Sequence, residues 1–191
     1  MINKDVDVIA YLLNNKEKDI NISGTANGLH LDYKSAHNIV KRLEENNVIT
    51  LYSFGKSSKI HMNLSCNPLL YEAEYKRRQE ILKNKDIKTI LEYFERNIQS
   101  KFCVMLLFGS YVKKKQTKYS DIDLLFIIPD ESMEKNIQQV ASMIPIKLHI
   151  NIFTEKEFIA MKNSKQITVG SEAIKNNIIL LGIEQYYRLL Q

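Results

Sequence analysis

The sequence predicts an α/β chain of the α+β type: a small helical domain with a β-hairpin, then a mixed sheet with flanking helices. In the first third, apolar residues recur at helical spacing and give way to two short β-branched runs around a glycine loop. From residue 86 onward, helical patterns alternate with apolar, strand-like runs. A charged helical segment lies between these parts, so we expect domains at residues 1–69 and 86–191, joined by a linker helix at 70–85.

The composition is that of a globular protein of a reducing cytoplasm. The 191 residues are 45% hydrophobic and 26% charged, which allows a core without disulfides or a structural metal. Cys66 and Cys103 do not form a Cys-x-x-Cys pair, and the acidic N-terminal stretch does not resemble a signal peptide. No run of 18 apolar residues predicts a membrane helix, and the net charge of +5 permits contact with a polyanion without requiring it.

The first domain is expected to hold three helices and then a hairpin. Asp32 is a good N-cap for the third helix, because the apolar pattern of that helix begins just after it. The expected helices span 5–13, 23–29 and 33–46, and the expected strands span 48–52 and 59–64. This order, over residues 22–64, resembles a winged helix-turn-helix domain, most closely from Tyr33 to Thr50.

The winged-helix resemblance implies contacts with double-stranded DNA, made by the polar face of the third helix and by the hairpin. The residues implied are Lys34, Ser35, His37, Asn38, Lys41, Arg42 and Lys56. Residues 1–70 carry 8 basic and 7 acidic residues, however, and DNA affinity depends on neutralised phosphates. A winged helix used for homodimerisation or for protein contact therefore remains the alternative.

The second domain is expected to begin with a helix that follows Asp86 and has an apolar face through Phe94. Strands are expected at 102–108, 122–128 and 146–153, and helices at 131–143, 155–161, 171–179 and 183–190. The chemistry concentrates in the loop between the first two strands. It starts with Gly109-Ser110 and ends with Asp121-Ile-Asp123.

Asp121 and Asp123 are two residues apart at a strand, so both are expected to project to the same side. Neighbouring carboxylates repel each other unless a cation lies between them, and such oxygen ligands suit Mg²⁺ or Mn²⁺. Gly109 allows a sharp turn close to a phosphate, and Ser110 adds a hydroxyl donor. A helix is expected to start there, with free backbone N–H groups and with Lys113 nearby to attract anions.

Gly109-Ser110, ten residues and then Asp121-Ile-Asp123 resemble the signature of the nucleotidyltransferase superfamily that includes DNA polymerase β. The segment is most similar to the small prokaryotic members, the minimal nucleotidyltransferases, and the resemblance covers residues 86–191. It implies that Gly109, Ser110 and Lys113 contact the triphosphate of an NTP, with ATP expected. It also implies that Asp121 and Asp123 bind Mg²⁺ and are the catalytic residues.

The chain departs from this pattern at the third carboxylate that the family usually carries on a later strand. The strand expected at 146–153 offers Lys147, His149 and Asn151 on its polar face and no acid. Asn151 is the expected replacement ligand, with His149 an alternative. Glu155 or Glu157 can also be envisaged as reaching in from the next turn.

The resemblance implies a nucleotidyltransferase that moves an NMP from an NTP to a hydroxyl group. Because minimal nucleotidyltransferases often act as antitoxins, a partner protein is the expected acceptor. The alternative is a DNA-binding regulator whose degenerate nucleotidyltransferase domain senses a nucleotide without turning it over. The missing third carboxylate favours that alternative.

Overall fold

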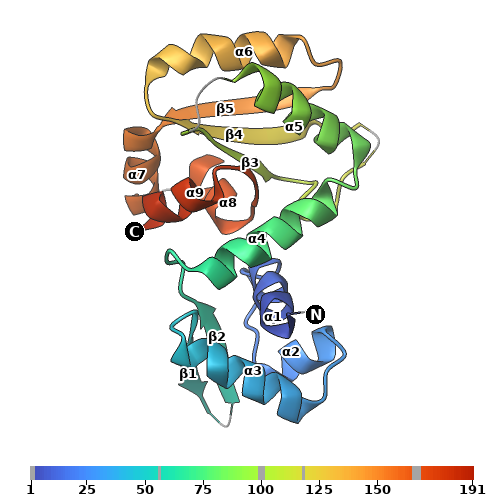
Figure 1. Ribbon diagram of the computed structural model, residues 1–191, viewed down its shortest axis with the longest axis vertical. Helices are drawn as coiled ribbons and strands as arrows, with labels where there is room; N and C mark the ends of the chain where they lie inside the picture. The colour runs from blue at the N-terminus through green and yellow to red at the C-terminus, as the bar shows by residue number, and fades with distance from the viewer. Residues whose placement is uncertain (1–2, 56, 99–101, 118, 165–168) are drawn as a thin grey trace. The chain divides into compact units, whose positions relative to one another are not determined.

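The computed structural model describes residues 3–55, 57–98, 102–117, 119–164 and 169–191 (Figure 1). The chain divides into two compact units, and the division lies between Lys76 and Arg77, inside helix α4 (Pro68–Ile81). The segment expected as a linker helix therefore contains most of α4, while α5 already starts at Lys85. Throughout the described ranges, no helix combines the length and the apolar character that a membrane span needs.

The first unit is a winged helix-turn-helix, as predicted. Helices α1 (Lys4–Leu13), α2 (Ile22–Gly28) and α3 (Tyr33–Glu45) precede an antiparallel hairpin of β1 (Ile49–Phe54) and β2 (Ser57–Met62). Asp32 caps α3 as expected, because its carboxylate accepts from Ser35 N at 2.9 Å. The apolar stripe of α3 is buried, at Ala36, Ile39, Val40 and Leu43.

The second unit contains a four-stranded mixed sheet in the order β5-β4-β3-β6. Strand β3 (Val104–Phe108) is antiparallel to β4 (Ile122–Ile128) and to β6 (Ile178–Leu181), whereas β5 (Leu148–Thr154) is parallel to β4. Strand β6 corrects the sequence analysis, which placed 171–179 in a helix. Helix α8 (Val169–Lys175) ends before Ile178, and the short apolar run that follows pairs with β3. The sequence did not predict this strand, because so short an apolar run has no periodicity that separates helix from strand.

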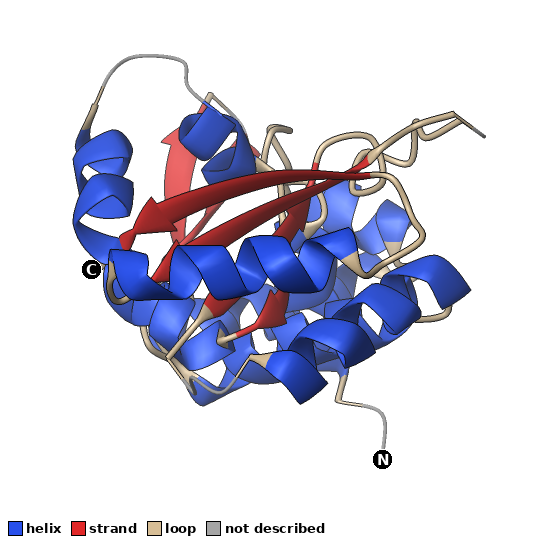
Figure 2. Ribbon diagram, turned by 90° about the horizontal axis from the view of Figure 1, so that it is seen from above, coloured by secondary structure: helices blue, strands red, loops and turns tan. Residues whose placement is uncertain are grey.

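Helices cover both faces of this sheet (Figures 1 and 2). Helices α5 (Lys85–Asn97) and α6 (Glu134–Ser142), the latter after the short 3-10 turn η1 (Glu131–Met133), share a core with Ile122, Leu124 and Phe126 of β4. Helices α7 (Glu155–Asn163), α8 and α9 (Ile183–Leu190) also contact the sheet strands. The alternate residue Leu125 is fully buried as well, so the second face of β4 is covered too.

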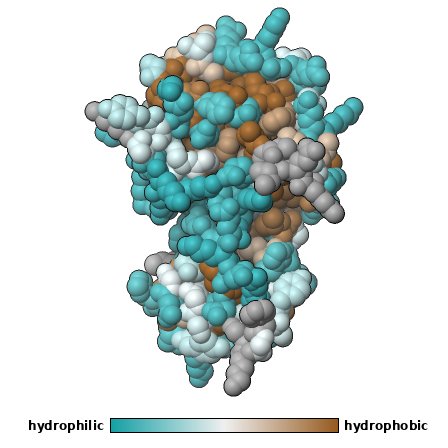
Figure 3. Space-filling model, turned by 180° about the vertical axis from the view of Figure 1, so that it is seen from behind, coloured by the Kyte–Doolittle hydropathy of each residue, from teal (hydrophilic) through white to brown (hydrophobic). Residues whose placement is uncertain are grey.

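Strand β5 lies at one edge of the sheet, and none of its residues is fully buried. Hydrophobic side chains reach the surface of this unit, as the brown areas in the upper part of Figure 3 show. Along β5 the residues alternate between the two faces, so His149 and Asn151 share the face of Asp123 and Leu125, their partners in register. The edge position keeps the His149 side chain open to solvent.

The two cysteines differ in environment and give a first testable prediction. Cys103 is only 4% exposed, and burial raises the pKa of its thiol to about 12, whereas Cys66 is exposed. Because the thiolate is the reactive form, we expect Ellman's reagent at pH 8 to label one thiol in the folded chain and two in guanidinium. Rapid labelling of both thiols in the folded chain, or failure of Cys66→Ser to abolish the fast phase, would contradict this burial.

Candidate functional site

The antiparallel pairing of β3 and β4 brings the glycine turn to the aspartates. Phe108, the last residue of β3, lies opposite Asp123, so Gly109 follows directly beside that carboxylate. Gly109 has φ of +72°, a conformation that favours glycine, and a Cβ added there would lie 2.1 Å from Asp123 Oδ2. The Asp123 carboxylate therefore packs against the bare backbone of the turn.

The residues after Gly109 form a tight turn and not the helix that the sequence analysis expected. Lys113 N donates to Gly109 O at 3.2 Å, and Lys115 N donates to Ser110 O at 2.9 Å. Between these two donors, Lys114 has a φ of +53°, which ends the helical backbone conformation. A longer helix is not formed here, because only thirteen residues connect the end of β3 to the start of β4. Within the described chain, no backbone carbonyl accepts from the N–H groups of Ser110, Tyr111 or Val112, so these donors remain available to an anion.

Each aspartate has a basic neighbour from β5 or from the residue just before it. His149 Nδ1 lies 3.1 Å from Asp123 Oδ1, and Lys147 Nζ lies 2.8 Å from Asp121 Oδ1. Because Lys147 and His149 are two residues apart at the start of β5, these contacts bring both carboxylates to the same side of that strand. Asp123 is the more enclosed of the two, with 24% of its side chain exposed against 35% for Asp121.

Asn151 lies one strand repeat beyond His149 on the same face, beside Leu125. Its Nδ2 atom is buried and has no hydrogen-bond partner in the described part of the chain. Glu155 and Glu157 follow the opposite end of β5, roughly 16 Å or more along the strand from His149. Glu157 instead closes a capping box, and the hydrogen bond from Thr154 N lowers its pKa. Neither glutamate belongs to the aspartate cluster.

Lys113, expected at the triphosphate, forms an ion pair with Glu172 of α8. Glu172 was not predicted as a neighbour of the site, because the two residues are 59 positions apart and no local pattern connects them. Because the ammonium group has three N–H donors, Lys113 can contact a nucleotide only with the donors that Glu172 leaves open.

In the first unit, the exposed side of α3 carries the residues expected at DNA. Lys34, Asn38 and Lys41 are exposed on successive turns, and Lys41 also pairs with Glu44 at 2.9 Å. His37 is half-buried and its ring centroid lies 6.1 Å from that of Tyr33. The backbone N–H of Ser35 donates to the Asp32 cap, and Lys56 lies outside the described residues.

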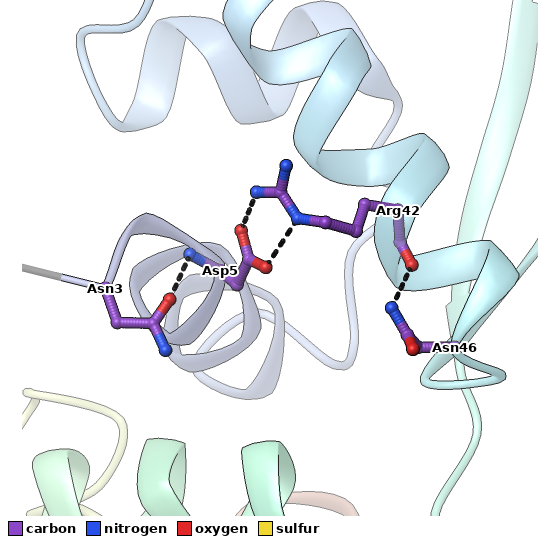
Figure 4. A network of polar contacts seen from close by, with 4 residues as sticks. All are labelled: Asn3, Asp5, Arg42 and Asn46. Carbon is purple, nitrogen blue, oxygen red and sulfur yellow. Dashed lines mark hydrogen bonds and ion pairs between the residues drawn. The ribbon is translucent and has the colours of Figure 1, made fainter.

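Arg42 has a different environment from the other polar residues of α3. Its Nε donates to Asp5 Oδ2 at 2.8 Å and its Nη2 donates to Asp5 Oδ1, which joins α3 to the start of α1 (Figure 4). The hydrogen bond to Asp5 raises the pKa of the Arg42 guanidinium. Such a two-pronged pair holds the guanidinium in one direction, so the geometry gives Arg42 a role in positioning α3.

Comparisons with known proteins add two findings. The crystal structure of MepR, a transcription regulator of the Staphylococcus aureus multidrug efflux pump MepA, is 15% identical to the chain, with a TM-score of 0.35. That match covers 52% of this chain and 81% of that one. No curated protein matches the chain. The family model for polymerase β nucleotidyltransferases matches residues 88–186, more than half of the chain, including the glycine turn, the two aspartates and strand β5. The chain therefore belongs to the polymerase β nucleotidyltransferase family.

Proposed function

We propose that the second unit transfers an NMP from an NTP, with ATP as the expected substrate, to a hydroxyl group of an acceptor. The observation that carries this proposal is the packing of Asp123 against Gly109, because it puts a carboxylate next to open backbone donors. Donors of this kind hold phosphate oxygens, and carboxylates hold the cation that accompanies a triphosphate. The family membership of residues 88–186 supports the same reaction class.

Each residue of the site has a defined task in this proposal. The N–H groups after Gly109 and the Ser110 hydroxyl donate to the phosphates and fix their orientation. Asp121 and Asp123 hold Mg²⁺, with Asn151 as the further candidate ligand on the same face. Mg²⁺, when bound, neutralises phosphate charge that develops during transfer. The acceptor oxygen forms a bond to the α-phosphorus, the bond to the bridging oxygen breaks, and pyrophosphate leaves as the hydroxyl proton is lost to solvent.

The acceptor is proposed to be a hydroxyl on a partner protein. The chain is incubated with ATP labelled at the α-phosphate, Mg²⁺ and co-purified partners, and the proteins are separated under denaturing conditions. Label on a partner, with equimolar pyrophosphate, is the expected result. Tight binding of ATP without pyrophosphate release would instead identify a nucleotide sensor, and no binding at all would refute both uses of the site.

We also propose that the first unit binds double-stranded DNA through the exposed side of α3. The exposed residues Lys34, Asn38 and Lys41 recur at the spacing of a helix face, which can enter a major groove. Duplexes enriched from a random pool by the full chain provide the ligand. A chain that retains no duplex and is dimeric by light scattering would use this unit for assembly instead.

Replacement of Lys41 gives a salt-dependent prediction. We expect Lys41→Ala to lower the slope of log affinity against log salt by about 0.9, the value for one lost phosphate contact. Asn38→Ala is expected to cost about 1–3 kcal/mol on the enriched duplex and little on random DNA. Lys83→Ala is the matched control, since Lys83 also pairs with a glutamate three residues away, Glu80. Equal slopes for Lys41→Ala and Lys83→Ala would show that Lys41 contacts no phosphate, and full affinity of Asn38→Ala for the enriched duplex as well would exclude this side of α3 from the interface.

A further inference from the structure

We infer that the nucleotide site holds a single divalent ion and that Lys147 supplies the second positive charge. This inference rests on the proposed function and specifies how the site balances the charge of a triphosphate. It follows from the acidic metal ligands present, from the fixed position of His149 and from the mobility of the exposed Lys147 side chain.

The described residues provide acidic ligands for one ion. Asp121 and Asp123 are the carboxylates at the turn, and nowhere in the described ranges do three or more His, Cys, Asp or Glu side chains gather as a metal-binding group. One or two carboxylates plus phosphate oxygens and water are an ordinary ligand set for Mg²⁺. Two ions a few ångströms apart would need further anionic oxygens to offset their mutual repulsion.

His149 occupies the place where a third carboxylate would have to stand. It is the residue of β5 in register with Asp123, and its Nδ1 already lies 3.1 Å from that carboxylate. The parallel ladder runs from Ile122 and Leu148 to Ile128 and Thr154, so its backbone cannot slide without a shift of the whole strand. An acid at position 149 would lie within reach of an ion on Asp123, but an imidazole brings no negative charge there.

Lys147, by contrast, is free to move. Its side chain is 79% exposed, and although its Nζ lies 2.8 Å from Asp121 Oδ1, that buried oxygen has no hydrogen-bond partner in the described chain, so the contact holds the lysine weakly. An ion that binds Asp121 takes over that carboxylate and releases the ammonium group. The lysine, which stands beside Asp121, can then donate to the oxygens of a phosphate bound at the turn.

The test counts ions per bound nucleotide. Mn²⁺ is titrated into the full chain saturated with α,β-methylene-ATP, and free Mn²⁺ is measured by electron paramagnetic resonance. We expect one Mn²⁺ per chain for the wild type and two for His149→Asp or His149→Glu. Gln139→Asp, which adds the same charge at an exposed position of α6, is expected to remain at one.

Lys147→Ala tests the second half of the inference by nucleotide affinity. We expect the affinity for the analogue to fall about tenfold in saturating Mn²⁺, as for a lost charged hydrogen bond. Lys88→Ala, which removes an exposed lysine paired with Glu92, is expected to leave it unchanged.

Two ions on the wild type would overturn the inference and leave the proposed function intact, as would an unchanged affinity in Lys147→Ala. Nucleotide bound with no ion would overturn the single-ion site. Absence of both nucleotide and ion would remove the proposed function as well.

Discussion

Replacing Asp123 by asparagine is expected to lower the rate of nucleotide transfer by about 10²–10³-fold, and the double variant Asp121→Asn/Asp123→Asn by at least as much. Asparagine keeps the size of the side chain and a hydrogen bond to His149, but it removes the charge that we propose holds Mg²⁺. The loss therefore falls on the reaction and on Mg²⁺ binding, and little on folding. Label transfer at saturating ATP and the midpoint of thermal unfolding are measured for each variant.

The control for this result is Asp130→Asn, in the loop after β4. Asp130 accepts from Ser132 N at 2.9 Å, a capping bond that asparagine also makes, and it is exposed. We expect it to retain the wild-type rate. Transfer by Asp121→Asn/Asp123→Asn at the wild-type rate would show that the aspartate pair is not the site of the reaction.

Gly109→Ala is expected to produce the second large effect. The new Cβ would lie 2.1 Å from Asp123 Oδ2 and 2.9 Å from Asp123 Cγ, so the carboxylate must rotate away from the turn. That movement separates the backbone donors of the turn from the carboxylate that we propose as the Mg²⁺ ligand. We expect affinity for Mg²⁺·ATP to fall at least tenfold, with a loss of unfolding free energy of about 2–4 kcal/mol from backbone strain and crowding.

Gly55→Ala separates strain from crowding. Gly55 also has a positive φ, of +57°, but no atom lies within 4 Å of a Cβ placed there. It should therefore lose only about 1–2 kcal/mol of unfolding free energy, and no affinity for Mg²⁺·ATP. Chemical denaturation and calorimetric titration give both quantities. If Gly109→Ala binds Mg²⁺·ATP as Gly55→Ala does, the close contact with Asp123 has no functional role.

Local patterns predicted the parts of this fold that local physics determines. The apolar stripe of α3 and the Asp32 cap can be predicted from the sequence, because helix periodicity and capping act within a few residues. Strand β6 could not be predicted in this way, since Ile178–Leu181 becomes a strand only by pairing with β3, about seventy residues earlier in the chain. The turn after Gly109 was wrongly expected to be a helix. The local sequence, Gly-Ser followed by lysines, does not show that the chain has to turn back there to pair β4 with β3.

In the candidate site, too, the features set by local sequence were predicted and the contacts set by tertiary packing were not. The Gly-Ser turn and the aspartate pair were predicted from spacing, and the antiparallel register of β3 with β4 explains why they meet. The polar face of β5 was also predicted, but its contacts were not. Only the register shows that His149 stands at Asp123 while Asn151 lies one repeat further on. The ion pairs of Lys113 with Glu172 and of Arg42 with Asp5 depend on tertiary packing, so they could not be inferred from local sequence.

Calorimetric titration of ATP into the full chain, with and without millimolar Mg²⁺, is the most direct measurement of whether the glycine turn and the aspartates form one nucleotide site. The structure predicts one ATP bound per chain, with an affinity that rises on addition of Mg²⁺ in the wild type but not in Asp121→Asn/Asp123→Asn. Absence of binding, or the same Mg²⁺ response in both proteins, would contradict it.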